Sequence, residues 1–581
     1  MSDQDEKIRK KKQEWEQGPL KKALGRFSYL QQAPARFYTP LDTKDHDFLG
    51  NVGFPGEYPF TAGIYPFDPM AGLSKLAAKA PTASGLTRAA MYSGYGAPED
   101  TRDYYQQNIE RGIRQGPNLA MDLPTQCGYD SDNPLMEGEV GKVGVSIDTL
   151  RDLEVIYEPY QGEINLDGIA SNFTINAPAI YLIAMYVALA QKRGVPLNKL
   201  RATPQNDVLK EYIARGTYIF PPKPAMRLFR DTLVFINEHL PRMNITSMGC
   251  YHIREAGATR VQGLAYAMSI ACAYLEEGVN AGVEVDAFAP RFTFNAMGGS
   301  MEFLNEIAFQ RAARRMYARI LKERFGARDP RSMLLRQPVT AMIGPFSTTK
   351  QRPLNNLTRA VVGAIAGALS GGPPAAFPPY DEPLGLGWSR EAQQLAQDAG
   401  RILACEAKLL DVVDPFAGSY CMEALTDEIE EQAWAELDKL DKMGGIVPAI
   451  EQGYVQREVA KSAYEYQRRV ARGDAQIVGV NCFIGEHELE VETTRLVPHP
   501  YDPERRAQAE EKQIANLGEV KRTRNDSDGK RLLLELEQKA RNEEENLVTI
   551  MVECAKAYVT LQEVCDVLRG VFGEYEPPSI F

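Results

Sequence analysis

From about residue 90, short apolar runs alternate with longer segments in which apolar residues recur at helical spacing. The helical segments are 178–193, 224–240, 256–278, 300–325, 353–370 and 389–407. The apolar runs have the length of strands and lie at 118–123, 168–175, 200–203, 245–251, 285–294, 332–342, 375–377 and 410–413. This alternation predicts an α/β fold, a closed (β/α)₈ TIM barrel, with an open doubly wound sheet as the structural alternative.

The segments on either side of this alternating region follow other patterns. Residues 4–26 mix charged side chains with a narrow apolar stripe, typical of a solvated helix that packs on its own body or on a partner chain. Residues 28–75 are rich in Pro, Gly and Tyr and predict an extended arm. Charged helices at 424–471 precede a strand-like run at 477–485 and further helical segments.

These patterns divide the chain into three parts. Residues 1–89 form an N-terminal helix and extended arm, which we expect to contact a partner and to border substrate entry. Residues 90–423 form the catalytic (β/α)₈ barrel, and residues 424–581 form a helical C-terminal region.

The composition argues against several classes of function. The formal net charge is −12 and no long basic run occurs, which argues against a nucleic-acid partner. No apolar stretch reaches the roughly 18 residues of a membrane span, and the N-terminus lacks the apolar core of a signal peptide. The eight Cys are scattered without a CxxC pair, as suits a reducing cytoplasm, and no His, Asp and Glu cluster has metal-ligand spacing.

Polar residues follow the third predicted strand. Thr203 and Gln205 lie where this strand ends and a helix begins, and Asp207 is placed to cap that helix. Arg215 follows eight residues later. Because strand-to-helix loops form the ligand-binding face of a parallel α/β protein, we expect this segment to be one wall of a pocket, with Arg215 pointing into it.

Other strand ends carry candidate chemistry with more than one interpretation. Residues 121–134 are denser in polar and turn residues than a simple turn requires, which favours a ligand-facing loop. His252 is either a satisfied buried imidazole or a general acid or hydrogen-bond donor to a carbonyl oxygen. Arg291 pairs either with a structural carboxylate such as Asp286 or with a ligand phosphate or carboxylate.

Five motifs resemble the large, catalytic part of the coenzyme B12-dependent acyl-CoA mutases, which include methylmalonyl-CoA mutase. They are PTQCGYDSDNP, TPQNDVLKEYIARGTYIFPP, GCYHIREAGAT, FAPRFTF and VVDPFAGSYCMEALT. The resemblance covers the chain from about residue 90 to its C-terminus. It implies a barrel whose mouth faces a cobalamin, and radical 1,2-rearrangement of an acyl-CoA carbon skeleton.

The family's cobalamin domain carries a DxHxxG motif, and none surrounds the five histidines of this chain. The resemblance therefore implies a divergent large subunit of a split enzyme, with adenosylcobalamin carried by a separate small B12-binding subunit. It also implies an α2β2 heterotetramer, and it raises the expectation of a G-protein chaperone.

The resemblance assigns roles to particular residues. It makes His252 and Tyr92 catalytic, as the hydrogen-bond donor to the thioester carbonyl and as the aromatic gate beside the migrating group. The implied substrate-binding residues are Arg215, Gln205, Thr203, Arg291, Thr293, Asn118 and Arg88. The implied cofactor-binding residues are Met121, Val143, Arg215, Glu255, Ala256 and Glu382.

Three positions bear on the acyl group. Isobutyryl-CoA mutases carry Phe at the gate and Gln in place of the arginine, and 2-hydroxyisobutyryl-CoA mutases carry Ile at the gate and Asp at the position of Ala120. Tyr92, Ala120 and Arg215 match the methylmalonyl-CoA and succinyl-CoA pattern instead. A buried substrate carboxylate needs a fixed guanidinium, so we expect a carboxylated acyl-CoA.

Departures from the family pattern leave other interpretations open. The arginine-rich stretch that holds CoA phosphates is reduced to Arg88, and the His-x-Gln near the cofactor is Pro-Val-Thr at 338–340. These changes favour a larger substituted succinyl-CoA as substrate. The alternatives are an isobutyryl-CoA or 2-hydroxyisobutyryl-CoA mutase, a catalytically degraded scaffold paralogue, and a non-radical lyase that uses His252 and a metal.

Overall fold

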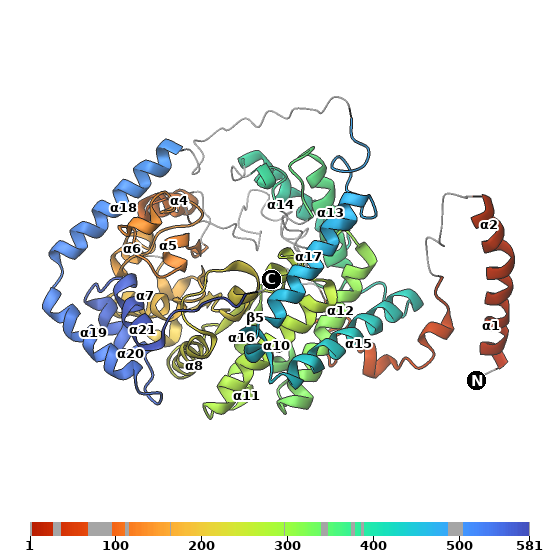
Figure 1. Ribbon diagram of the computed structural model, residues 1–581, viewed down its shortest axis with the longest axis horizontal. Helices are drawn as coiled ribbons and strands as arrows, with labels where there is room; N and C mark the ends of the chain where they lie inside the picture. Colours follow the sequence, from red (N-terminus) through yellow and green to blue (C-terminus); the bar gives the residue numbers. More distant parts are fainter. Residues whose placement is uncertain are drawn as a thin grey trace.

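The computed structural model describes residues 3–26, 37–67, 94, 96–110, 115–162, 164–295, 297–337, 347–372, 378–384, 389–485 and 503–579. Helices make up most of these residues and surround a few short strands (Figure 1). Within the described residues, no helix is both long enough and apolar enough to cross a membrane.

In the described part of the chain, five short strands follow one another in parallel. β1 (Asn118–Ala120), β2 (Ser171–Thr174) and β3 (Ala202–Pro204) form one ladder, and β4 (Thr246–Met248) pairs with β5 (Phe292–Phe294). Further backbone hydrogen bonds extend this order. The Ser247 N–H donates to the Gln205 carbonyl after β3 at 2.9 Å, and the Phe294 N–H donates to the Arg336 carbonyl at 2.8 Å. The carboxyl ends of neighbouring strands therefore lie at one edge.

The two faces of the strands differ in polarity. Leu119, Phe173 and Met248 are buried beneath the surrounding helices. The alternate positions are polar and more exposed, namely Asn118, Asn172, Thr203 and Ser247. Register places Asn118 beside Asn172, and Asn172 beside Thr203. Since side chains alternate across a strand, one face forms the core and the other a polar surface.

The predicted helices of the alternating region are confirmed, with their ends shifted by a few residues. They are α7 (Ala179–Lys192), α8 (Pro222–His239), α10 (Arg260–Asn280), α12 (Phe303–Arg319), α13 (Asn355–Leu369) and α14 (Arg390–Cys405). Shorter helices lie between or before the strands, namely α4 (Pro98–Glu110), α5 (Leu123–Gln126), α6 (Leu150–Ile156), α9 (Cys250–Glu255) and α11 (Val285–Phe288).

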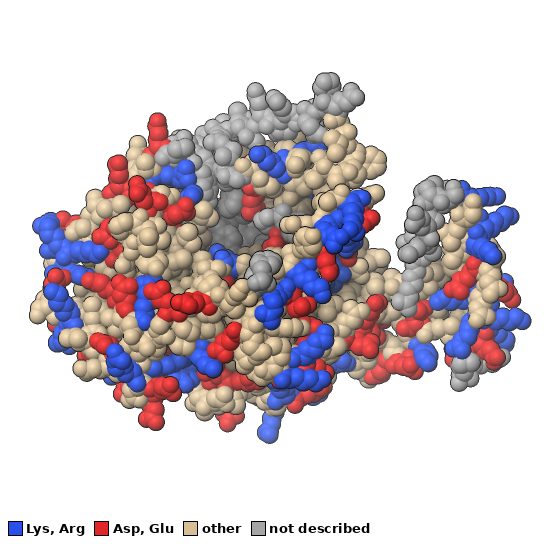
Figure 2. Space-filling view, in the orientation of Figure 1, with Lys and Arg blue, Asp and Glu red and all other residues tan. Residues whose placement is uncertain are grey.

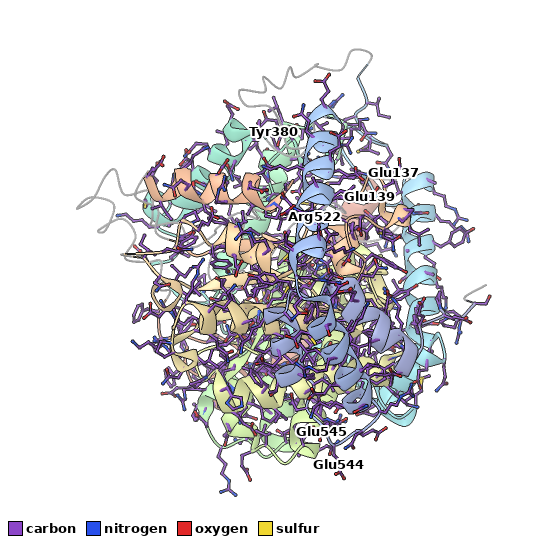
Figure 3. All side chains as sticks on the ribbon, turned by 90° about the vertical axis from the view of Figure 1, so that its left-hand side faces the viewer. Glu137, Glu139, Tyr380, Arg522, Glu544 and Glu545 are labelled. Carbon is purple, nitrogen blue, oxygen red and sulfur yellow. The ribbon has the colours of Figure 1, made fainter. Side chains whose placement is uncertain are left out.

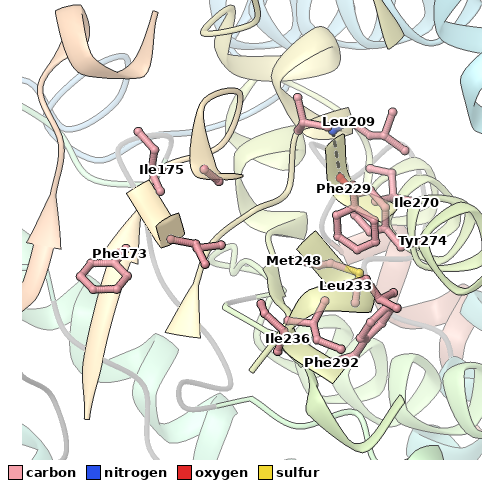
Figure 4. Close-up of a cluster of buried hydrophobic side chains, with 14 of the residues drawn as sticks. Phe173, Ile175, Leu209, Phe229, Leu233, Ile236, Met248, Ile270, Tyr274 and Phe292 are labelled. Carbon is pink, nitrogen blue, oxygen red and sulfur yellow. Dashed lines mark hydrogen bonds between the residues drawn. The ribbon is translucent and has the colours of Figure 1, made fainter. Parts of the chain in front are cut away.

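Aromatic packing joins the strands to α8 and α10. Phe229 of α8 stacks on Tyr274 of α10 with ring centroids 4.1 Å apart, next to Met248 of β4 (Figure 4). The Leu209 N–H donates to the Tyr274 hydroxyl at 3.0 Å, the bond drawn dashed in Figure 4. The core is therefore tied directly to the loop that follows β3.

Several strand predictions are wrong. In the segment 285–294 the chain first forms α11 and a 3₁₀ turn, Ala289–Arg291, so only 292–294 is a strand. Residues 330–333 form another 3₁₀ turn, because Pro330 begins it and the Asp329 carboxylate accepts the Arg331 N–H at 2.9 Å. Residues 410–413 form turns and bends. Residues 338–342 and 375–377 lie outside the described residues.

The strand-like run 477–485 is also a turn rather than a strand. Val478 and Cys482 form an isolated bridge. The Asn481 side chain closes the turn, since it accepts from the Ile477 N–H at 2.6 Å and donates to the Ala475 carbonyl at 2.7 Å. An amide that hydrogen-bonds its own backbone in this way competes with strand pairing.

The C-terminal region is helical, as predicted, and covers two sides of the molecule. The helices α15 (Tyr420–Lys442), α16 (Ile446–Glu451) and α17 (Tyr454–Arg472) lie on the side of α10 and α12 (Figure 1). The helices α18 (Pro503–Thr523), α19 (Asp526–Ala540), α20 (Val548–Lys556) and α21 (Leu561–Phe572) cover the opposite side. Figure 3 shows this side, with Arg522 at α18 and Glu544 and Glu545 at its lower end.

The N-terminal helix stands apart from the rest of the molecule. The helices α1 (Asp3–Trp15) and α2 (Lys21–Arg26), joined by a π-helical turn, carry charges of both signs (Figures 1 and 2). Lys12 approaches Asp42 to 3.8 Å. The described part of the arm that follows is not simply extended, because it contains a 3₁₀ turn at Pro40–Thr43 and a π-helical turn at Phe48–Val52.

A buried arginine fastens α12 to α15. Arg311 donates to Asp414 at 2.9 Å and to both carboxylate oxygens of Glu423 at 2.7 and 3.0 Å, and its side chain is completely buried. Neighbouring Arg314 donates to the carbonyls of Phe60 and Thr61, which attaches the N-terminal arm to the same helix.

We expect Arg311→Met to lower the free energy of unfolding by about 3–5 kcal/mol, because it removes the cation that hydrogen-bonds two buried carboxylates. Urea denaturation followed by circular dichroism measures this change. Arg331→Met, which breaks an exposed ion pair with Asp329, is the control and should leave the midpoint unchanged. Equal midpoints for the two variants would contradict the assigned role of Arg311.

Candidate active site

The loop after β3 departs from the regular helix that the sequence predicts. Asn206 has a left-handed backbone with φ of 44°, and a π-helical turn occupies Glu211–Arg215. Gly216 ends that turn in the left-handed conformation, with φ of 79°. Such wide turns are frequent at functional sites.

Asp207 does not cap the helix as expected. Its carboxylate accepts from the Gly249 N–H at 2.8 Å and from the Tyr274 hydroxyl at 2.9 Å. Burial raises the pKa of Asp207 to about 6, although Lys210 and these donors oppose the rise. The carboxylate therefore connects the loop after β3 to the loop after β4.

A buried polar network fills the space behind this loop. Lys210 and Glu211 are both completely buried and form an ion pair. Asn176, which follows β2, donates to the Glu211 carboxylate at 2.7 Å and to the side-chain oxygen of Gln205 at 2.9 Å. The Arg215 guanidinium approaches Glu211 to 3.7 Å and keeps 31% of its side chain exposed. The network thus ends in two side chains, Gln205 and Arg215.

His252 lies in α9, directly after β4. Its Nδ1 is buried and has no hydrogen-bond partner among the described residues. Burial, together with the charges of Lys210 and Arg215, holds the pKa of His252 well below its ordinary value. The imidazole is therefore neutral near pH 7, and a neutral imidazole can donate a hydrogen bond to a carbonyl oxygen without transferring a full proton.

A glycine allows His252 to lie where it does. A Cβ atom at Gly249 would stand 2.5 Å from His252 Nδ1 and 3.6 Å from the Lys210 side chain. A methyl group cannot fit at 2.5 Å, so the close approach of backbone and imidazole requires glycine here. Tyr251 packs on the imidazole, with ring centroids 3.7 Å apart.

We expect Gly249→Ala to push the imidazole outward and to raise the pKa of His252 toward its ordinary value of 6.5. Displacement would remove part of the desolvation and increase the distance from Lys210. An NMR pH titration of ¹³C-labelled histidine measures this directly, because the chain has only five histidines. Gly570→Ala is the control, since a Cβ there meets no atom within 4 Å. An unchanged His252 titration would refute the steric argument.

The expected substrate residues do not all lie at this edge. Thr203 faces the polar side of the strands, where its hydroxyl accepts from Asn244 at 2.7 Å. Thr293 donates to the Thr246 carbonyl at 2.8 Å and is almost buried. Asn118 begins β1 and lies on the same polar face. Thr203, Thr293 and Asn118 therefore lie within the strands, along their polar face.

Arg291 lies at the other end of the strands. It precedes β5, whereas His252 follows the parallel strand β4. Its guanidinium donates to the carbonyls of Ile236 at 3.3 Å and Ala287 at 3.0 Å. Asp286 does not pair with it, and accepts instead from the Ser332 hydroxyl at 2.7 Å. In the structure, Arg291 therefore binds the backbone of α8 and α11 and lies away from His252.

The expected cofactor residues flank the carboxyl ends of the strands. Met121 follows β1 and pairs with Val145, close to Val143, whose side chain is 61% exposed. Glu255 and Ala256 end α9. Burial raises the pKa of Glu382 to about 7, with further contributions from Asp381 and Glu255, so these carboxyl groups lie near one another. Tyr92 and Arg88 lie outside the described residues.

Sequence reasoning missed Asn176, Lys210 and Glu211. One signal was present in the sequence, because Lys210 and Glu211 interrupt the apolar residues of 208–214, and Asn176 directly follows a predicted strand. Buried charges are rare unless they are paired, so such an interruption points to a network.

In the described part of the chain, no group of three or more His, Cys, Asp or Glu side chains is placed to hold a metal ion.

Taken together, the fold and site define an α/β protein with a buried, charged side-chain network at the carboxyl ends of parallel strands. The family model described as methylmalonyl-CoA mutase matches residues 29–574. The chain belongs to this family of isomerases, the acyl-CoA mutases, which in general depend on adenosylcobalamin.

Individual relatives support the same assignment. The chain is 36% identical to the 2-hydroxyisobutanoyl-CoA mutase large subunit of Aquincola tertiaricarbonis, over 99% of this chain and 98% of that protein. It is 36% identical to the methylmalonyl-CoA mutase of Escherichia coli (strain K12), over 84% of this chain and 66% of that protein. It is 33% identical to the mitochondrial methylmalonyl-CoA mutase of Homo sapiens, over 90% of this chain and 66% of that protein. The chain thus spans about two thirds of these methylmalonyl-CoA mutases.

Proposed function

We propose that this chain is the large subunit of an adenosylcobalamin-dependent mutase that rearranges the carbon skeleton of a carboxylated acyl-CoA. The observation that carries the proposal is the position of Arg215. Its guanidinium is partly exposed, and Glu211, at 3.7 Å, is its one charged partner among the described residues. Asn176 links Glu211 to Gln205, and the charge of Arg215 helps to lower the pKa of His252. A guanidinium in this state can pair with a substrate carboxylate.

Each of the three side chains has a separate task. Arg215 pairs with the free carboxylate, and neutral His252 donates a hydrogen bond to the thioester carbonyl. Gln205 is 4% exposed and contacts the acyl group next to its free carboxylate. The polar positions Asn118, Thr203 and Thr293 line the path of the CoA arm between the strands, and Tyr92 and Arg88 complete the gate and the phosphate contact. Holding the acyl group at both ends orients it and limits the access of water.

The chemistry of the cofactor-side residues fits adenosylcobalamin. Val143, beside Met121, offers an exposed apolar surface for the faces of a large ring. Glu255 and Ala256 end the neighbouring helix, and Glu382, with a pKa of about 7, can both donate and accept hydrogen bonds to hydroxyl and amide groups. When bound, the cofactor supplies the radical chemistry that starts the rearrangement, and the protein supplies placement.

The same proposal extends to architecture and partners. The five parallel strands and their order support a closed (β/α)₈ barrel at 90–423, between the arm at 1–89 and the helical region at 424–581. The relative described as a large subunit supports a separate small B12-binding subunit as partner. An α2β2 assembly, a G-protein chaperone and a cytoplasmic location complete the proposal.

The acyl group has a second candidate. The relative from Aquincola tertiaricarbonis matches nearly the whole chain and supports a 2-hydroxyisobutyryl-CoA type of substrate, and isobutyryl-CoA is a related neutral ester. Arg215 favours a methylmalonyl-CoA or succinyl-CoA type, including larger substituted succinyl-CoA esters. A catalytically degraded scaffold paralogue would keep the fold and lose turnover altogether.

We expect the chain, combined with its small subunit and adenosylcobalamin, to isomerise a dicarboxylic acyl-CoA, and Arg215→Gln to reduce kcat/KM for that ester by about a hundredfold or more. The reason is the loss of the partner of a desolvated carboxylate. Arg230→Gln, at a remote helix, should have no effect. Chromatography of the CoA esters measures both.

Turnover of isobutyryl-CoA or 2-hydroxyisobutyryl-CoA alone, unaffected by Arg215→Gln, would refute the carboxylated substrate. Absence of turnover with every ester would support the scaffold.

A further inference from the structure

The Lys210–Glu211 ion pair is unusual because both side chains are completely buried. Removing two charges from water costs more than their mutual attraction usually returns, so apolar replacements of buried pairs are often neutral or stabilising. Stability alone therefore does not explain why the two charges are buried at the loop that carries Gln205 and Arg215. The contacts of Glu211 offer a different explanation.

One oxygen of Glu211 is fixed by the end of its own turn. Oε2 accepts from the Thr217 hydroxyl and from the Thr217 N–H, the latter at 3.3 Å. Thr217 directly follows Gly216, whose left-handed conformation ends the π-helical turn. The carboxylate is therefore held in one orientation by the backbone of the loop on which Arg215 lies.

The other oxygen of Glu211 faces the cations and the amide network. Oε1 accepts from Lys210 Nζ and, at 2.7 Å, from Asn176 Nδ2, and it lies 3.7 Å from Arg215 Nη1. Arg215 is four residues beyond Glu211, so the ion pair lies across one turn of the same element. Glu211 thus restrains the guanidinium from the protein side and leaves its other side accessible.

The same network determines which end of the Gln205 amide faces the pocket. The Asn176 side-chain oxygen accepts the Asp207 N–H at 3.0 Å, so the Asn176 NH₂ must point to Glu211 and Gln205. Gln205 therefore accepts from Asn176 with its oxygen, at 2.9 Å. Its NH₂ group has no acceptor among the described residues and remains available to a ligand oxygen.

We propose that Glu211 is the positioning residue of this pocket, and that it fixes the Arg215 guanidinium and the Gln205 NH₂ group so that both present donors to the carboxylate end of an acyl group. The inference rests on the proposed function and assigns its substrate selectivity to a side chain that does not touch the substrate. Lys210 balances the charge of Glu211 within the buried network.

Selectivity for a carboxylate is the property to measure. We expect the purified chain to bind succinyl-CoA more tightly than butyryl-CoA, which has no free carboxylate, in isothermal titration calorimetry. Glu211→Gln should reduce that preference about tenfold or more, because the guanidinium loses its restraint and the Asn176 amide its charged acceptor. Binding of butyryl-CoA should change by less than about threefold. A merely destabilised protein would lose both ligands in parallel.

Two further variants keep the test decisive. Glu430→Gln removes another buried carboxylate, which pairs with Arg315 and Arg319 far along the chain, and should leave the preference intact. If Glu211→Gln leaves Lys210 uncompensated and fails to fold, the double variant Lys210→Met/Glu211→Leu removes both charges together. That variant should fold and still lose the preference.

The possible results separate the two proposals. A wild-type chain that binds neither ester, or both equally, would overturn the proposed carboxylated acyl-CoA and with it this inference. A wild-type preference that persists in folded Glu211→Gln, or in the double variant, would overturn the role of Glu211 and leave the proposed function standing. Loss of preference in Glu430→Gln to the same extent would also overturn the role of Glu211.

Discussion

The buried Asp207 carboxylate joins the core to the site. Its two oxygens accept from the Gly249 N–H and from Tyr274, and Tyr274 stacks on Phe229 in the apolar core. The loops after β3 and β4 are thereby held at a fixed separation by rigid elements. The positions of Gln205, Arg215 and His252 all depend on this connection, because each lies on one of these two loops.

The effective charge around Arg215 and His252 depends on the neighbouring groups and not only on the residue types. Lys210 is neutralised by Glu211, which leaves Arg215 as the cation that a ligand can reach. The same cations, with burial, keep His252 neutral. A neutral hydrogen-bond donor and a charged one can therefore belong to the same site.

Part of this arrangement could be predicted from the sequence and part could not. The helices from 178 to 407 follow from apolar periodicity, and the family follows from motifs around Gln205 and His252. The position of Arg291 could not be predicted, because an arginine next to a strand looks the same at either end of it. Only the direction of β5 places it beside Ile236, away from the ligand edge. The 3₁₀ turn at 330–333, in the place of part of a predicted strand, likewise depends on its side-chain cap, Asp329.

The sequence by itself determined the alternation of strands and helices, the family, and the residue types available for recognition. These depend on local periodicity and on short motifs, which a linear chain displays directly. The tertiary structure alone decided that Asn176, Gln205 and Glu211 meet, since they come from the ends of β2 and β3 and touch only when those strands lie side by side. It also decided the orientation of the Gln205 amide and the charge of His252, because both are fixed by donors and cations distant in sequence or hidden from solvent.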